Sequence, residues 1–308
     1  MSRLSIFLAG VVLAPIPVDF ISTLTIGRDG EWYTTNDVSV SNSTRAVSFQ
    51  VATHSDDFVM IGASNFDDHP TGAANISFKM TTENSQIYTL SVENTVFPYA
   101  TRISYLPIGF DSPLTRDTGS VAVIRRDNTH SDLVIRSTAD YFSNNCRPDT
   151  LMTLSVESPR NEIGVQVNLW NGTNLLTNYG NHQLFFGRRS IFNRMLRIPR
   201  EMYDRIREIM ISSGGFVPTT HPNVFSECSR ASIEQLPTID LRYDTGSLVF
   251  QPADYIDFNA AADDSCRLRV DTAESGRTSE IDPLMLIGKN IRVTSDNVWD
   301  ICDSNATL

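Results

Sequence analysis

The sequence predicts an all-β protein with a few short helices. Several segments alternate apolar and polar residues with a period of two and are rich in β-branched side chains, as strands are. Clusters of Asn, Asp, Gly and Pro separate these segments at short intervals, as turns do in β proteins. Apolar residues make up 41% of the 308 residues, which is enough for a sizeable core and argues against global disorder.

Strand character recurs along the chain, and a helical period interrupts it near residue 200. The segments with strand character are 46–63, 86–97, 120–126, 132–138 and 162–170. In segment 198–215, Met202, Ile206 and Met210 follow one another at intervals of four, which places them on one face of a helix. Pro199 suits the first turn of that helix, and a Gly-Gly pair predicts its end.

The chain is acidic, with 25 Lys and Arg residues against 36 Asp and Glu residues and a net charge of −11. This charge balance argues against a nucleic-acid partner and against adhesion to anionic membranes.

The N-terminal residues have the pattern of a secretory signal peptide. Arg3 precedes an apolar run over 4–14, about half of the roughly 20 residues that a membrane-spanning helix needs. We interpret residues 1–18 as the signal peptide, the alternative being a buried N-terminal strand. Since no other stretch could span a membrane, no membrane association is expected after signal removal.

Possible glycan acceptors and an even number of cysteines also indicate secretion. Sequons of the form Asn-x-Ser/Thr occur at Asn42, Asn75, Asn171 and Asn305. The four cysteines are compatible with two disulfides in an oxidising compartment, and no Cys-x-x-Cys motif or Cys/His cluster indicates a metal site. We therefore expect a protein that is secreted or lies in the lumen of the secretory or endolysosomal pathway.

The segments from residue 120 onward resemble, in order, the C-terminal lobe of pepsin-like aspartic proteases. The stretch 120–142 resembles the hairpin that opens that lobe, and 195–209 resembles its strand-to-helix passage. The most specific piece is CSRASIEQLPTIDLRYDTGSLVFQPADYI (228–256), and 283–308 resembles the closing segment. The resemblance implies a bilobal fold, with an N-terminal lobe over 19–115 and a C-terminal lobe over 116–308. Turn-forming residues concentrate near this boundary.

The resemblance also implies a disulfide between Cys228 and Cys266. A pairing of Cys146 with Cys302 is a hypothesis that requires both residues to approach the central interlobe sheet.

The signature of aspartic proteases, Asp-Thr-Gly-Ser, occurs twice, at Asp117 and at Asp244. Catalysis in that family needs two carboxylates about 3 Å apart that share a proton. Asp244 lies between two alternating strands and inside the cysteine pair, where the family has a hairpin turn. Asp117 follows a polar segment and precedes the C-lobe sequence, which indicates another turn. Ser190 stands where the family's second catalytic Asp is expected, so the resemblance implies that this Asp is lost.

The leading hypothesis is a secreted pepsin-like protein without proteolytic activity that binds a peptide or protein in the interlobe cleft by strand addition. The alternative is an active aspartic endopeptidase that hydrolyses peptide bonds at acidic pH, using Asp117 with Asp244 or with an unrecognised partner. A third hypothesis makes the N-terminal half an unrelated β-sandwich module. We expect a monomer that needs neither a metal nor a cofactor.

Overall fold

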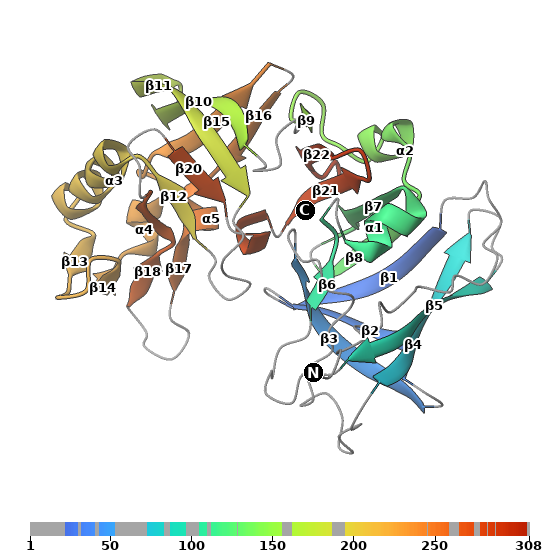
Figure 1. Ribbon diagram of the computed structural model, residues 1–308. Helices are drawn as coiled ribbons and strands as arrows, with labels where there is room; N and C mark the ends of the chain where they lie inside the picture. Colours follow the sequence, from blue (N-terminus) through green and yellow to red (C-terminus); the bar gives the residue numbers. More distant parts are fainter. Residues whose placement is uncertain are drawn as a thin grey trace, which may run out of the picture. The chain divides into compact units, whose positions relative to one another are not determined.

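The computed structural model describes most of the chain after residue 21, and its described residues are dominated by strands (Figure 1). The described residues are 22–29, 32–40, 43–52, 73–82, 87–96, 105–109, 112–127, 129–155, 162–186, 195–244, 246–258, 265–273, 278–281, 283–286 and 288–306. The predicted all-β class with short helices is confirmed. The predicted signal peptide, residues 1–18, lies outside the described residues.

The chain divides into two compact units. The first comprises residues up to Cys146 together with Gly288–Asn297 and Ser304–Leu308, and the second comprises Arg147–Ile287 and Val298–Asp303. This division differs from the boundary at residues 115 and 116 that the sequence indicated. Strand pairing explains the difference, because the two strands that follow residue 119 directly, Ser120–Arg125 and His130–Ile135, pair with each other, and the second of them pairs with the strand Ser22–Asp29.

The first unit contains these elements: β1 (Ser22–Asp29), β2 (Trp32–Val40), β3 (Ser43–Ala52), β4 (Ala73–Thr82), β5 (Ile87–Val96), β6 (Tyr105–Pro107), α1 (Pro113–Thr118), β7 (Ser120–Arg125), β8 (His130–Ile135), α2 (Ala139–Ser143) and β21 (Lys289–Thr294). Its strands follow the order β6-β3-β2-β4-β1-β8-β7-β21, and β5 pairs with β4. Most of these pairs are antiparallel, while β3 and β6 run parallel.

Strands β7 and β8 form the buried hairpin of the first unit. The side chains from Val121 to Ile124 and from Leu133 to Ile135 are at most 2% exposed, so both faces of the hairpin are covered. A continuous run of apolar residues suits a strand that is buried on both faces. In the turn between the strands, the Asp127 carboxylate accepts hydrogen bonds from the backbone N–H groups of Thr129 (2.6 Å) and His130 (2.7 Å).

The second unit contains these elements: β9 (Met152–Ser155), β10 (Glu162–Asn171), β11 (Asn174–Phe186), β12 (Leu196–Ile198), α3 (Arg200–Ser212), β13 (Phe216–Pro218), β14 (Val224–Cys228), α4 (Arg230–Ile233), β15 (Thr238–Tyr243), β16 (Gly246–Phe250), α5 (Pro252–Tyr255), β17 (Ile256–Phe258), β18 (Cys266–Leu268), β19 (Val270–Thr272), β20 (Thr278–Ile281), the 3₁₀ helix η2 (Pro283–Leu286) and β22 (Val298–Asp303). A seven-stranded sheet has the order β16-β15-β10-β11-β20-β12-β19, and a four-stranded sheet has the order β13-β14-β18-β17. Strand β9 pairs with β22.

The helix predicted near residue 200 is confirmed as α3. Met202, Ile206 and Met210 are fully buried, as their spacing indicated, because residues four apart share one helical face. The helix follows β12 directly, with Pro199 between them, and ends before Gly214, which has a φ of +71°. Figure 1 shows α3 (yellow) near β12 and β13, and the contacts of α3 with β13 and β19 hold it against the second unit.

No helix in the described part of the chain is long and apolar enough to cross a membrane.

Candidate functional site

The first Asp-Thr-Gly-Ser copy lies at the end of a helix in the first unit. Asp117 belongs to the last turn of α1, whose N-cap Ser112 accepts a hydrogen bond from the Thr115 backbone N–H at 3.2 Å. Gly119 ends the helix with a φ of +81°. A helix therefore stands where the sequence indicated a turn. The Ser-Pro pair that opens α1 is a helix-start signal that could have predicted this.

The second copy forms a hairpin turn in the second unit. Asp244 follows β15 and precedes β16, and the residues on either side of the turn, Tyr243 and Gly246, pair with each other. The Asp244 side chain is exposed. Among the described residues its carboxylate has no hydrogen-bond partner, so no described hydroxyl or carboxylate braces it as proton sharing requires.

The other predicted site residues are distributed as follows. Ser190 and Asn42 lie outside the described residues, and Asn75 lies in β4. Asn171 ends β10 and is exposed at the β10–β11 hairpin. Asn305 is exposed, and its side-chain amide donates a hydrogen bond to the Asn144 carbonyl at 2.7 Å.

All four cysteines are oxidised. Cys228 and Cys266 form a disulfide with a Cα–Cα distance of 5.9 Å, which is the pair that the family resemblance implies. This bond joins the end of β14 to the start of β18, next to the backbone pairing of those strands. Cys146 and Cys302 are disulfide-bonded as well.

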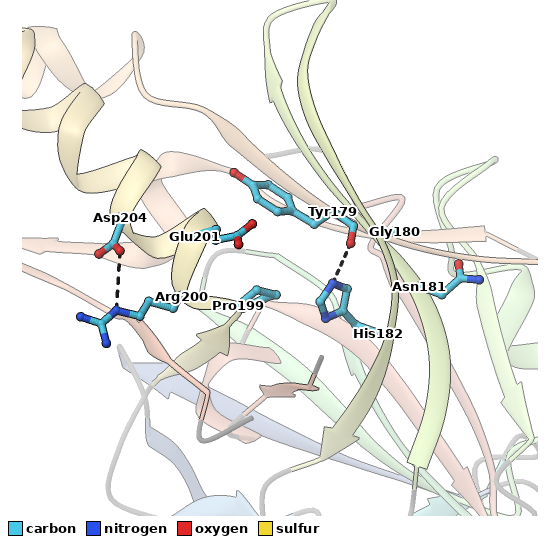
Figure 2. A pocket seen from close by; sticks show the side chains of 8 residues that line it. All are labelled: Tyr179, Gly180, Asn181, His182, Pro199, Arg200, Glu201 and Asp204. Atoms are coloured by element: carbon cyan, nitrogen blue, oxygen red, sulfur yellow. Dashed lines mark hydrogen bonds and ion pairs between the residues drawn. The ribbon is translucent and has the colours of Figure 1, made fainter. Parts of the chain in front are cut away.

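A pocket of about 600 Å³ opens in the second unit between β11 and the start of α3 (Figure 2). Its volume falls in the range of small-ligand sites. The lining residues are Tyr179, Gly180, Asn181, His182, Pro199, Arg200, Glu201 and Asp204.

A β-bulge shapes one wall of this pocket. In the β10–β11 ladder Gln166 pairs with Asn181 but Asn168 pairs with Asn178, so two residues of β11, Tyr179 and Gly180, stand opposite one residue of β10. Gly180 has a φ of +78°, a conformation that glycine adopts readily. The backbone carbonyl of Tyr179, inside this bulge, accepts a hydrogen bond from a side chain of the same strand.

The imidazole of His182 supplies that hydrogen bond. Its Nε2 lies 2.9 Å from the Tyr179 carbonyl oxygen, and because a carbonyl can only accept, Nε2 carries the hydrogen. In a neutral imidazole Nδ1 is then an acceptor. His182 is only 5% exposed, and Nδ1 has no hydrogen-bond partner among the described residues. Figure 2 shows the ring reaching from β11 toward Pro199, with Nδ1 on the edge away from the Tyr179 carbonyl.

The first turn of α3 forms the opposite wall and carries most of the charge. Arg200 and Asp204 form an ion pair at 3.7 Å along the helix. Glu201 lies between them in sequence, and in Figure 2 its carboxylate is on the Tyr179 side of the helix. Carboxylates in the first turn of a helix are favoured by the helix dipole.

The phenol of Tyr179 is half-buried between these walls. Burial is the largest influence on its pKa and raises it; a hydrogen bond with Thr177 and the Arg205 charge lower the pKa, and the Glu201 charge raises it. Tyr179 therefore stays protonated at neutral pH and can present both an aromatic face and an O–H group.

The sequence did not predict this pocket. His182, which has polar neighbours in the sequence, is buried within β11. The Asn-Tyr-Gly-Asn-His segment around the bulge carries a signal that could have been used, since a Gly inside a strand pattern often marks a bulge. No group of three or more metal-binding side chains gathers anywhere in the described part of the chain.

No protein-family model matches this chain, and a search of curated proteins finds no match either.

Proposed function

We propose that this chain is a pepsin-like protein that has lost its catalytic pair and binds a peptide or protein without hydrolysing it. The order of elements in the second unit supports the pepsin-like part of this proposal. The β12–Pro199–α3 passage, the β15–β16 hairpin followed by α5, and the Cys228–Cys266 disulfide occur where the sequence resemblance requires a strand-to-helix passage, a hairpin and a disulfide.

The observation that carries the loss of proteolysis is the environment of Asp244. An aspartic protease holds each catalytic carboxylate in a braced position, where two carboxylates share a proton and activate a water molecule. Asp244 is instead exposed on a hairpin turn with no described hydrogen-bond partner. An exposed, unbraced carboxylate lacks the means to share a proton, so the second signature supports a turn rather than a catalytic loop.

The two disulfides support secretion or a lumenal location, because disulfides persist in oxidising compartments.

A cleavage assay tests the proposal. The purified protein is incubated with an unfolded protein substrate over roughly pH 3–6, the range in which carboxylates can share a proton, with and without a statine inhibitor. We expect no inhibitor-sensitive cleavage. Fluorescence anisotropy with labelled fragments of the same substrate should show saturable binding in the same preparation.

The variants Asp117→Asn and Asp244→Asn are the controls. Cleavage that the inhibitor blocks, and that either variant abolishes, establishes an active endopeptidase and contradicts the proposal. If no fragment binds, the proposal that the protein binds a peptide or protein is wrong.

A further inference from the structure

The charges on the first two turns of α3 leave one carboxylate of the pocket uncompensated. Arg200 pairs with Asp204, and Arg205 pairs with Glu208 at 2.5 Å. Glu201, which lines the pocket, has neither an ion-pair nor a hydrogen-bond partner among the described residues. Glu201, an exposed side chain, is therefore the one carboxylate among the described lining residues of the pocket that no described cation pairs with.

The buried imidazole of His182 contributes an unsatisfied acceptor to the pocket. Its Nε2–H is used by the Tyr179 carbonyl, which leaves Nδ1 as a hydrogen-bond acceptor without a described donor. A buried acceptor without a donor destabilises the protein, so a bound group that donates a hydrogen bond to it recovers that loss. Figure 2 shows His182 and Glu201 on facing walls of the same pocket, on either side of Pro199.

The exposed Glu201 carboxylate and the buried His182 Nδ1 are both acceptors, and this decides which ligand chemistry fits the pocket. A ligand that satisfies them must donate hydrogen bonds, and the Glu201 charge favours a cation. An anion is disfavoured, because the start of α3 already holds two carboxylates of its own, Glu201 and Asp204, and its Arg200 is paired. The aromatic ring of Tyr179 adds a face over which a cation can lie.

We propose that this pocket binds a guanidinium group of the kind that an arginine side chain carries. A guanidinium is planar and has five N–H donors, so it can pair with the Glu201 carboxylate, lie against the Tyr179 ring and direct a further N–H toward His182 Nδ1. Nδ1 is covered in this structure, so that last contact needs a small displacement of the pocket wall. The inference uses the pocket's geometry alone and stands independently of any likeness to proteases.

Calorimetric titration of the full chain tests the proposal with two matched probes. N-acetyl-arginine amide carries the guanidinium, and N-acetyl-citrulline amide has nearly the same shape without the charge. We expect the arginine compound to bind at least ten times more tightly. Glu201→Gln should lower its affinity at least tenfold. Glu208→Gln, the same change on the same helix outside the pocket, should leave the affinity within twofold.

Nuclear magnetic resonance of the histidine ring nitrogens follows His182 without altering a buried residue. Addition of the arginine compound should shift the His182 Nδ1 resonance with the same saturation curve as the calorimetric signal, while the exposed ring of His130 does not respond. A titration that leaves Nδ1 unchanged contradicts the role of His182.

The source of the guanidinium is resolved by a third probe, a capped tripeptide with arginine at its centre. Tenfold tighter binding of the tripeptide indicates a polypeptide partner, and equal binding indicates a small guanidinium compound. Equal affinity for citrulline, binding of inorganic phosphate in competition with the arginine compound, or no binding of the arginine compound at roughly ten millimolar each overturns the proposal.

Discussion

Residues 117–120 and residues 244–247 spell the same four amino acids, yet the first segment ends a helix and the second turns a hairpin. In the first, the Thr118 hydroxyl donates to the Leu114 carbonyl at 2.7 Å, and the Ser120 hydroxyl donates to the Ser137 carbonyl at 2.9 Å. These hydroxyl groups are buried and bond to the backbone. In the second, the strands β15 and β16 on either side determine the turn.

The glycines of the two segments are required for different reasons. Gly119 has a φ of +81°, which disfavours any other residue, but a methyl group there would meet nothing within 4 Å. Gly246 has an ordinary φ, but a methyl group there would lie 2.2 Å from the Leu151 carbonyl oxygen. The four-residue motif makes these glycines look equivalent. Gly119 permits a left-handed backbone conformation, whereas Gly246 permits the close approach of two chain segments.

The largest effect is expected for Gly246→Ala. Because the new methyl group collides with backbone, the β15–β16 hairpin must move away from Leu151, and overpacking of this kind costs about 3 kcal/mol of unfolding free energy. Urea unfolding followed by circular dichroism measures the loss. Gly164→Ala in β10, where a methyl group meets nothing within 4 Å, is the control and should change stability little. Equal stability of the two variants contradicts the role given to Gly246.

A smaller loss is expected for Gly119→Ala. The left-handed backbone conformation costs a residue with a Cβ atom about 1–2 kcal/mol, with no steric collision to add to it. Gly119→Asn should lose less, because asparagine tolerates positive φ better than alanine does. The same unfolding experiment checks this order, and a loss that exceeds that of Gly246→Ala would reverse the comparison between the two glycines.

The acidic residue of the hairpin copy is expected to matter little to stability. Asp244 is exposed and has no described hydrogen-bond partner, so Asp244→Asn should change the unfolding free energy by less than about 0.5 kcal/mol. A substantially larger change, measured by the same urea titration, would indicate a buried or paired carboxylate and would weaken the assignment of this copy to a turn.

The aspartate of another hairpin turn, Asp127, is hydrogen-bonded, and these bonds change its pKa. At the β7–β8 turn, hydrogen bonds from the Thr129 backbone N–H, the Thr129 hydroxyl and the His130 N–H hold the pKa of Asp127 well below its usual range. The folded protein thus favours the ionised form. This stabilisation is present above the ordinary Asp pKa of about 3.9 and is lost as pH falls below it.

The Asp127→Asn variant should therefore lose less stability than the unaltered protein on acidification from about pH 5 to about pH 3. Urea midpoints at the two pH values measure the difference. Identical pH dependence in both proteins would show that the turn does not hold the carboxylate ionised.

Much of the secondary structure could be predicted, because periodicity reports burial directly. The predicted strand at 162–170 corresponds to β10, and the helix with Met202, Ile206 and Met210 corresponds to α3. Helix α1 is not evident from periodicity, because its six residues are too few to show a helical period. The Ser112–Pro113 pair is nevertheless a signal for the start of a helix.

The candidate site could not be predicted to the same extent. The pocket joins Tyr179 and His182 on β11 to Glu201 on α3, and this meeting depends on a bulge that shifts the register of β11 by one residue. Sequence spacing does not reveal which strand a bulge faces or which helix packs nearby. The unpaired state of Glu201 also depends on how its neighbours pair, which only the structure gives.

The most direct test of the central proposal, binding without a catalytic pair, compares two peptides that differ by one hydroxyl group. A statine-containing peptide places that hydroxyl where an aspartic protease binds its attacking water, and the deoxy peptide lacks it. Calorimetry should give the two peptides affinities within about twofold of each other, because the protein has no catalytic pair of carboxylates to bind the hydroxyl. Binding of the statine peptide about a hundredfold more tightly, the gain typical of transition-state analogues, would contradict the account.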